Sequence, residues 1–335
     1  MNNYLTRLIN LKRLAVWTVA ILCIFFVVSQ PQDAKACMKT PPPEKIKAII
    51  IGDRVVDIAY NLGVLPEAMS VRGSLWPMAK QLRTVSQILG CPKCVVAKKG
   101  IIPNALAERG IKRVIVEKND SFCLYRPKMK PENIAPILAG MDVTVEYVDF
   151  SQGLEAAVRQ AAKLLNRESK ADKVIENYKK NMAMAKAMLP VSALGKKVII
   201  FSGTYQPSTG KYLLRVEAPD GYSDRFLLKP LGCTNVGDSF RPGNKEASNG
   251  HYQVRKQKNG FDLTPLIEAN PDVIVSTGDG FAVQKAIQVY AKKHPAILAV
   301  TAVKNMAVYS LPFYADSSVI EYPDVLKKWT VALSK

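Results

Sequence analysis

The chain has 335 residues, of which 47 are lysine or arginine and 28 are aspartate or glutamate, which gives a formal net charge of +19. This length can bury one large core or two lobes, and the basic charge favours an anionic ligand or surface. The sequence has no GxGxxG, Walker or GxSxG motif and only two histidines, which disfavours nucleotide-dependent and triad enzymes. No basic-aromatic module for nucleic acid is present. We therefore expect a binding protein that has no catalytic site, no cofactor and no nucleic-acid partner.

The N-terminus has the three parts of a secretory signal peptide. Basic residues precede an apolar run at 14–29, and Ala34-Lys35-Ala36 supplies a cleavage signal. The run has 16 residues, whereas a helix needs about 20 to span a bilayer. We predict a signal peptide at 1–36, a proline-rich leader at 37–44 and a periplasmic or other extracytoplasmic location. An uncleaved membrane anchor and lipidation of Cys37 stay open, although Lys35 argues against lipidation.

Five cysteines follow the predicted cleavage point, so at least one is unpaired, intermolecular or modified. Two of them form a CPKC motif, Cys91 and Cys94, which are the disulfide candidates. Redox motifs of the thioredoxin type place such a pair at the start of a helix. We expect Val95-Val96 to be extended, which favours structural thiols or a structural disulfide over redox chemistry or metal ligation.

Strand and helix patterns alternate along the first half of the chain. Short apolar runs bounded by glycine or proline predict buried strands, and apolar residues at helical spacing predict the intervening helices. This alternation indicates βαβ units with a mostly parallel sheet. The predicted strands are 47–51, 69–71, 113–116 and 143–148, and the predicted helices are 55–62, 100–110 and 131–140.

Residues 154–190 interrupt this alternation with sustained helical periodicity. Ser169 is a plausible N-cap for a second helix of about 20 residues, which would extend about 30 Å. Such a helix can join two lobes, and the alternative is an ordinary pair of surface helices.

The second half resumes the alternation. We expect strands at 197–201 and 271–276, an extended segment in 300–311, and helices at 262–270 and 323–333. The stretch 204–259 is irregular and too long for a plain connection. It is either a ligand-binding surface built from loops or peripheral decoration.

Ligands of open α/β sheets bind beyond the carboxyl ends of the strands. Arginine and aromatic side chains in such loops suit a bulky, partly anionic chelate, because they supply charge-assisted hydrogen bonds and ring contacts. For each position the alternative is an ordinary surface side chain. The candidate ligand-binding residues are Asp53, Arg54, Arg72, Trp76, Lys118, Tyr205, Arg241, His251, Tyr252, Asp279, Phe313 and Tyr314.

Three segments resemble the periplasmic binding proteins of iron-siderophore, haem and vitamin B12 importers. They are IIIGDRVVDIAYNLGVLPEAMSVRG near the start, GFDLTPLIEANPDVIVST in the second half, and AVYSLPFYADSSVIEYPDVLKKW at the end. In that family a strand, a polar turn, a helix ending in Leu-Gly and a second strand recur in the order of the first segment. The resemblance covers about 45–333. The stretch 107–112 and the CPKC motif depart from the family pattern, which bears on the ligand more than on the fold.

The resemblance implies an α/β fold of two lobes, each with a mostly parallel sheet flanked by helices, joined by a long rigid helix. The implied domains are 45–168, 169–190 and 191–335. It also implies an extracytoplasmic monomer that captures a ferric siderophore, haem or corrinoid and docks on an ABC permease, with Asp57 as the N-lobe docking residue. The alternatives are an exported thiol-redox or metal-dependent protein that uses Cys91 and Cys94, and a sensor with the same fold that takes no part in transport.

Overall fold

The computed structural model describes residues 42–73, 76–120, 122, 129–258, 260–314, 316 and 319–335. Residues 43–335 form one compact unit. The predicted signal peptide, most of the leader with Cys37, and Cys123 lie outside the described residues. Within the described ranges, no helix combines the length and apolar character needed to cross a membrane.

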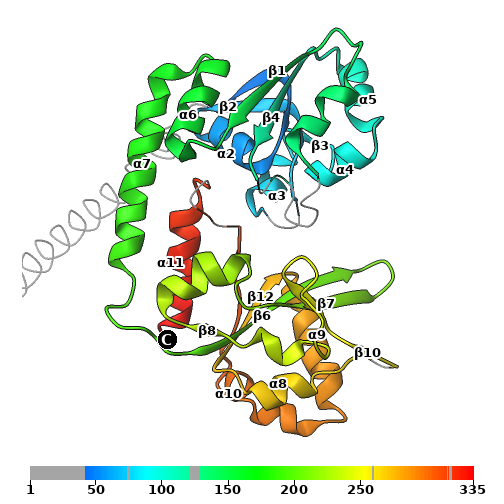
Figure 1. The fold of residues 1–335 in the computed structure, drawn as a ribbon, viewed down its shortest axis with the longest axis vertical. Helices are drawn as coiled ribbons and strands as arrows, with labels where there is room; N and C mark the ends of the chain where they lie inside the picture. Colours follow the sequence, from blue (N-terminus) through cyan, green and yellow to red (C-terminus); the bar gives the residue numbers. More distant parts are fainter. Residues whose placement is uncertain are drawn as a thin grey trace, which may run out of the picture. The chain divides into compact units, whose positions relative to one another are not determined.

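The first half of this unit, which we call the N-lobe, is built on a five-stranded sheet of order β3-β2-β1-β4-β5 (Figure 1). Every neighbouring pair is parallel, as predicted. Alternate residues of β1 enter different cores, with Ile50 in one and Ile49 and Ile51 in the other. Both faces of the sheet are therefore covered, which is why its central strands β1 and β4 contain continuous buried apolar runs.

The N-lobe strands and helices follow one another along the chain. The strands are β1 (Glu44–Ile51), β2 (Val64–Ser70), β3 (Gln87–Ile88), β4 (Arg113–Lys118) and β5 (Thr144–Asp149). The helices are α2 (Asp53–Asn61), α3 (Met78–Leu82), α4 (Pro92–Ala97), α5 (Ile101–Arg109) and α6 (Gly153–Leu164). The predicted helix at 131–140 is only two short 3-10 turns, Pro131–Asn133 and Ala135–Ile137, because Pro136 removes a helical hydrogen-bond donor.

The second half, which we call the C-lobe, contains a sheet of order β13-β12-β6-β7-β9, with β8 also paired to β6. Its strands are β6 (Lys197–Gln206), β7 (Lys211–Glu217), β8 (Thr234–Asn235), β9 (His251–Gln253), β12 (Val273–Gly278) and β13 (Val308–Ser310), and a separate small hairpin pairs β10 (Lys256–Gln257) with β11 (Gly260–Phe261). Its helices are α8 (Thr264–Ala269), α9 (Gly280–Ala291), α10 (Thr301–Lys304) and α11 (Tyr322–Leu333).

The prediction of an α/β fold is confirmed, but the C-lobe sheet is mixed. Strands β6, β12 and β13 are parallel, whereas β7 is antiparallel to both β6 and β9. The stretch 204–259, predicted to be irregular, supplies β7 and β9. Its turn between Gln206 and Lys211 includes Gly210 at a φ of 65°, so β6 reverses directly into β7.

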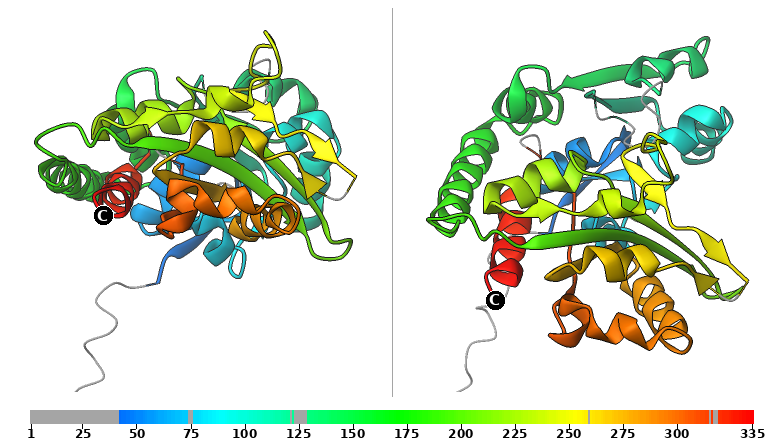
Figure 2. Two further views of the ribbon diagram at one scale, coloured as in Figure 1. Left: turned by 90° about the horizontal axis from the view of Figure 1, so that it is seen from below. Right: turned by 60° about the horizontal axis from the view of Figure 1, so that its bottom comes forward.

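Helix α7 (Glu168–Ala187) confirms the predicted 20-residue helix between the two sheets, although its N-cap is Arg167 and Ser169 lies inside the first turn. Its first turns bury Ala171, Val174 and Ile175 in an N-lobe core, and its last turns bury Ala185 in a C-lobe core. It lies beside α6 and α11 (Figures 1 and 2). One helix therefore contributes apolar side chains to the cores of both lobes.

A second connection between the lobes follows β13. Phe313 packs in the C-lobe core that also contains Trp329 of α11, whereas the next residue, Tyr314, and Val319 are buried in the N-lobe core. The chain thus enters the N-lobe core after leaving the last strand of the C-lobe and returns through α11. This return determines the surroundings of several residues that we predicted to contact a ligand.

Candidate ligand-binding site

A buried ionic network lies where the segment between β13 and α11, which we call the returning segment, meets the N-lobe. Arg54 donates to Glu117 at 2.9 Å and to Asp316 at 2.6 Å. Arg72 pairs with Asp53 through its side chain, and its backbone N–H donates to the same carboxylate at 2.5 Å. The network links residues that are up to 262 positions apart, so it can form only when the whole chain has folded.

Tyr314 closes this network from the side of the returning segment. The guanidinium carbons of Arg54 and Arg72 each lie 5.2 Å from the centroid of its ring, and Arg72 donates to its hydroxyl at 3.2 Å. Burial raises the pKa of the Glu117 carboxyl, and the two guanidinium groups oppose that rise. Burial also lowers the pKa of Arg54, but facing groups, including Glu117, more than offset this and hold that pKa well above its ordinary value. The arginines therefore stay charged and hold the returning segment on the N-lobe.

Several residues predicted to contact a ligand belong to this network or pack beside it. Their side chains have no accessible surface or almost none, so they present nothing to a ligand in this structure. The exposed fractions are 0% for Asp53, 1% for Arg54, 3% for Arg72, 0% for Trp76, 8% for Phe313 and 0% for Tyr314. The structure therefore supports a role for them in joining the lobes.

A pocket of ≈ 830 Å³ lies between residues of the two lobes. Ligand pockets typically enclose about 300–1,000 Å³, so this cavity is large enough for a bulky small molecule. Its N-lobe lining comes from α3 and from the turn and helix that follow β3, and its C-lobe lining comes from β6, β7 and the segment between β12 and α9. The lining residues are Lys80, Cys91, Lys93, Cys94, Ser202, Gly203, Thr204, Tyr205, Arg215, Asn249, Gly278, Asp279 and Gly280.

The C-lobe wall of this pocket depends on a close approach between β6 and the start of α9. The backbone N–H of Asp279 donates to the carbonyl of Gly203 at 3.0 Å. A Cβ at Gly203 would lie 2.5 Å from the Asp279 carbonyl oxygen, so only glycine fits there without a shift. Asp279 caps α9 by accepting from the N–H of Phe281 at 3.0 Å. Tyr205 stands beside this cap, with its ring 4.8 Å from that of Phe281.

The N-lobe wall corrects our expectation for the CPKC motif. Residues after Cys91 form α4 rather than an extended segment, with Cys91 as the N-cap and Pro92 in the first turn. Proline suits that position because its missing N–H would have no helical partner and its φ is already helical. The two sulfur atoms lie 3.3 Å apart as thiols. The motif thus has the helix-start placement that is typical of redox cysteines.

Cationic groups outnumber carboxylates in the pocket lining. Lys80 and Lys93 come from the N-lobe and Arg215 from the C-lobe, against the carboxylate of Asp279. Lys285 stands nearby, with its ammonium group 5.1 Å from the centroid of the Tyr205 ring. The lining therefore favours a ligand that carries negative charge.

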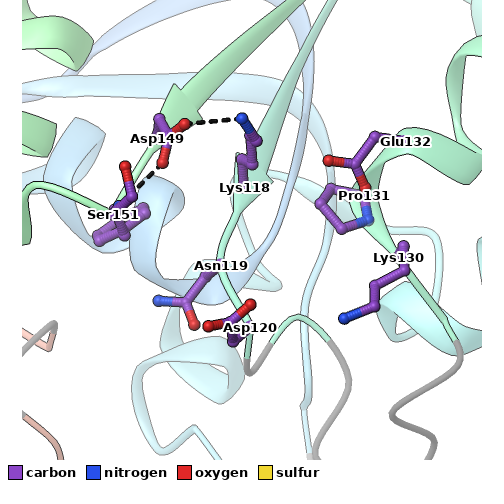
Figure 3. Close-up of a pocket in the computed structure, with 9 residues that line it drawn as sticks. Lys118, Asn119, Asp120, Lys130, Pro131, Glu132, Asp149 and Ser151 are labelled. Atoms are coloured by element: carbon purple, nitrogen blue, oxygen red, sulfur yellow. Dashed lines mark hydrogen bonds and ion pairs between the residues drawn. The ribbon is translucent and has the colours of Figure 1, made fainter.

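A second pocket, of ≈ 470 Å³, lies at the carboxyl ends of β4 and β5 (Figure 3). Lys118 lines it and donates to Asp149 at 2.8 Å. This hydrogen bond and the Ser151 N–H, which donates to Asp149 at 2.8 Å, lower the pKa of that carboxyl to about 2. Lys118 thus lies at a different pocket from Tyr205 and Asp279, and the charge of Asp149 balances its own.

Three other predicted ligand-binding residues line neither pocket. Arg241 pairs with Asp238 at 2.8 Å and lies 5.6 Å from the ring centroid of Tyr252, whose hydroxyl donates to the same Asp238 at 2.7 Å. The Nδ1 atom of His251 lies 3.0 Å from the carbonyl oxygen of Asn249. Asn249 lines the pocket between the lobes, so His251 contacts a residue of the wall.

The predicted docking residue Asp57 lies inside the N-lobe. It is 2% exposed and accepts a hydrogen bond from Asn61 at 3.1 Å. Burial, reinforced by the charges of Glu321 and Asp53, raises the pKa of Asp57 well above its ordinary value. A buried carboxyl offers no surface to a permease, so the structure does not support Asp57 as a docking residue.

The pocket lining also includes four charged or polar residues that the rule of strand ends does not select, namely Lys80, Lys93, Arg215 and Asn249. From the sequence we interpret Cys91 and Cys94 as a disulfide candidate and not as ligand contacts. The CPKC motif itself was the available signal for the N-lobe wall, whereas Lys80 and Arg215 carry no local pattern that separates them from other basic residues. Among the described residues, no group of three or more His, Cys, Asp or Glu side chains is arranged to hold a metal ion.

Solved structures resemble this fold over most of the chain. The periplasmic heme-binding protein HutB of Vibrio cholerae matches with a TM-score of 0.54 and 16% identity, over 87% of this chain and 100% of its own. The periplasmic heme-binding protein RhuT from Roseiflexus sp. RS-1 gives 0.57 and 13%, over 87% and 98%. The iron-uptake system-binding protein FeuA from Bacillus subtilis gives 0.52 and 18%, over 86% and 94%.

At these identities the likeness establishes the fold, which is the two-lobed α/β fold of periplasmic solute-binding proteins. No protein-family model matches the sequence, and no curated protein sequence matches it significantly.

Proposed function

We propose that the protein is an extracytoplasmic substrate-binding protein that captures an organic metal chelate between its lobes and delivers it to an ABC permease. The observation that carries this proposal is the ≈ 830 Å³ pocket lined by residues of both lobes. The structural neighbours include proteins described as periplasmic heme-binding and iron-uptake system-binding, and they share this fold. The positive lining suits the carboxylates or other anionic groups of such chelates.

Export and delivery are the other parts of the proposal. The N-terminal pattern of basic residues, apolar run and Ala-Lys-Ala supports export. Capture outside the cytoplasm then requires transfer to a membrane partner, and we propose that the protein does this as a monomer. Fractionation of producing cells tests the location, and sedimentation tests the oligomeric state.

Ligand capture is tested by isothermal calorimetry and thermal unfolding of the purified protein. The probes are haemin, a corrinoid and a ferric tricatecholate. A ligand at 100 times its Kd should raise the free energy of unfolding by about 2.7 kcal/mol. We expect one probe to do so, and we expect Tyr205→Ala to weaken its binding about tenfold, roughly 1.4 kcal/mol, because Tyr205 lines the pocket.

Arg241→Ala is the matched control, because Arg241 is an exposed C-lobe residue that lines neither pocket. It should bind the same probe with the affinity of the wild type. If no probe binds, the proposal of a chelate receptor fails. If Tyr205→Ala and Arg241→Ala behave alike, the ligand occupies another site.

The placement of Cys91 at the start of α4, with its sulfur 3.3 Å from that of Cys94, favours a second candidate function, thiol–disulfide exchange. An exchange enzyme should accelerate the reduction of a peptide disulfide by dithiothreitol. Cys91→Ser should abolish that acceleration, whereas Cys233→Ser, which removes a buried thiol of the C-lobe, should not. Absence of any acceleration by the wild type would eliminate this candidate.

A further inference from the structure

The CPKC motif supplies two sulfur atoms to the pocket between the lobes. Cys91 and Cys94 both line it, and both are partly exposed. The two sulfur atoms lie 3.3 Å apart and are not joined as a disulfide in this structure. A ligand in this pocket would therefore contact the side chains of both cysteines.

The backbone holds these sulfurs in fixed positions. Leu89 donates to the carbonyl of Met69 at 2.8 Å, which ties the chain before the motif to β2. Gly90 has a φ of 115°, and a Cβ there would lie 3.1 Å from the Cβ of Cys94, so glycine permits the turn that precedes Cys91. Val95 is fully buried in an N-lobe core and anchors the other side of the motif. Such pre-organisation is what a ligand-binding group needs.

Cross-linking contributes little to the fold at this position. A disulfide between Cys91 and Cys94 would close a loop of only four residues, and the entropy that a disulfide removes from the unfolded chain decreases as the loop becomes shorter. The N–H of Cys94 already donates to the carbonyl of Cys91 at 2.7 Å, so the turn is closed without the sulfurs. The exposure of the pair to the pocket is accordingly better explained by contact with a ligand.

The charges around the sulfurs point to the same ligand class. Lys80 and Lys93 line the pocket on the side of the cysteines, and Arg215 lines it from the C-lobe. Thiolates bind iron, cobalt and other transition metals, and a cysteine thiolate is an established ligand of haem iron. A hexadentate oxygen chelate of ferric iron leaves no coordination position for sulfur, whereas a planar macrocycle leaves axial positions open.

On the basis of the proposed function, we infer that Cys91 or Cys94 coordinates the metal of the captured chelate, and that the chelate is an iron or cobalt tetrapyrrole with anionic side groups. In the binding step the thiol loses its proton to solvent, the axial water leaves the metal, and a sulfur–metal bond forms without any change in oxidation state. The lysines and Arg215 then face the carboxylates of the macrocycle. The second sulfur of the pair stays within reach of the same metal.

Haemin is the probe that tests this inference, with the protein kept reduced by a phosphine. Titration of the wild type should produce the absorption and electron paramagnetic resonance spectra of thiolate-ligated ferric haem. The double variant Cys91→Ser/Cys94→Ser should lose that spectrum and bind haemin at least tenfold more weakly, and the single variants identify the ligating sulfur. Cys233→Ser is the matched control, because it removes a buried thiol outside the pocket lining.

Oxidation provides an independent readout on the unmutated chain. Diamide accepts two electrons and two protons as the two thiols become a disulfide. We expect this disulfide to weaken haemin binding as much as the double substitution does. A phosphine should restore it.

These measurements distinguish a failure of sulfur ligation from a failure of the proposed receptor function. If the double variant keeps both the affinity and the spectrum of the wild type for haemin, sulfur ligation is refuted while the chelate receptor stands. The inference is equally refuted if the wild type binds the ferric tricatecholate but not haemin. If no chelate binds, the proposed function fails with it.

Discussion

Glu217 lies at the end of β7 and is 2% exposed. Its carboxylate accepts from the N–H of Ser223 at 2.6 Å, from the Ser223 hydroxyl at 2.7 Å and from the N–H of Asp224 at 3.1 Å. Burial raises the pKa of Glu217 to about 7, although these three donors favour the ionised form and limit the rise. We therefore predict that Glu217 makes the stability of the protein depend on pH.

Proton linkage gives the sign and the size of this pH dependence of stability. The ordinary value of the Glu217 pKa is 4.5 and the folded value is about 7, so the folded state binds the proton more tightly between these pH values. The stability associated with this proton is fully present below the unfolded pKa and is lost as pH rises through the folded pKa. The full loss is about 3 kcal/mol at about 1.4 kcal/mol per unit, and about 2.5 kcal/mol of it falls between about pH 5 and pH 8.

Urea unfolding of the wild type and of Glu217→Gln over this pH range measures the effect. The amide keeps one oxygen for the two backbone donors and can donate to the Ser223 hydroxyl, so the variant should fold. Its free energy of unfolding should fall less than that of the wild type by about 2.5 kcal/mol on going from about pH 5 to pH 8. Glu268→Gln, at an exposed glutamate of α8, controls for the loss of one carboxyl group. Parallel pH profiles for the wild type and Glu217→Gln would refute the reasoning.

Two further predictions test the join between the lobes and the pocket wall. Arg54→Met should lower the free energy of unfolding by about 3–5 kcal/mol in urea titrations, because Glu117 and Asp316 stay buried without the positive charge of Arg54. An unchanged midpoint would show that the network does not stabilise the fold. Gly203→Ala should lower stability by about 1–3 kcal/mol and weaken binding of whichever chelate the wild type binds, because its Cβ would lie 2.5 Å from the Asp279 carbonyl oxygen. Calorimetry that shows wild-type affinity would mean that this wall does not shape the site.

Local patterns of residues are sufficient to predict those features of the fold that repeat over neighbouring positions. Apolar runs and helical spacing were enough to predict the α/β fold and the 20-residue helix α7, because buried strands and amphipathic helices impose those periods on neighbouring residues. The rule that ligands lie beyond strand ends also selected Tyr205 and Asp279, which line the pocket between the lobes. Tyr205 lies near the end of β6 and Asp279 directly after β12, and both stay partly exposed.

Contacts between distant segments control which of the other strand ends stay accessible. Asp53 and Arg72 also follow strands, yet both are buried together with Tyr314, which comes from the far end of the chain. Similarly, CPKC became the start of α4 and one wall of the pocket, although Val95-Val96 alone favours an extended segment. Burial of a polar loop or exposure of a thiol depends on which distant segment packs against it, and contacts across 262 residues leave no periodic signal in the sequence.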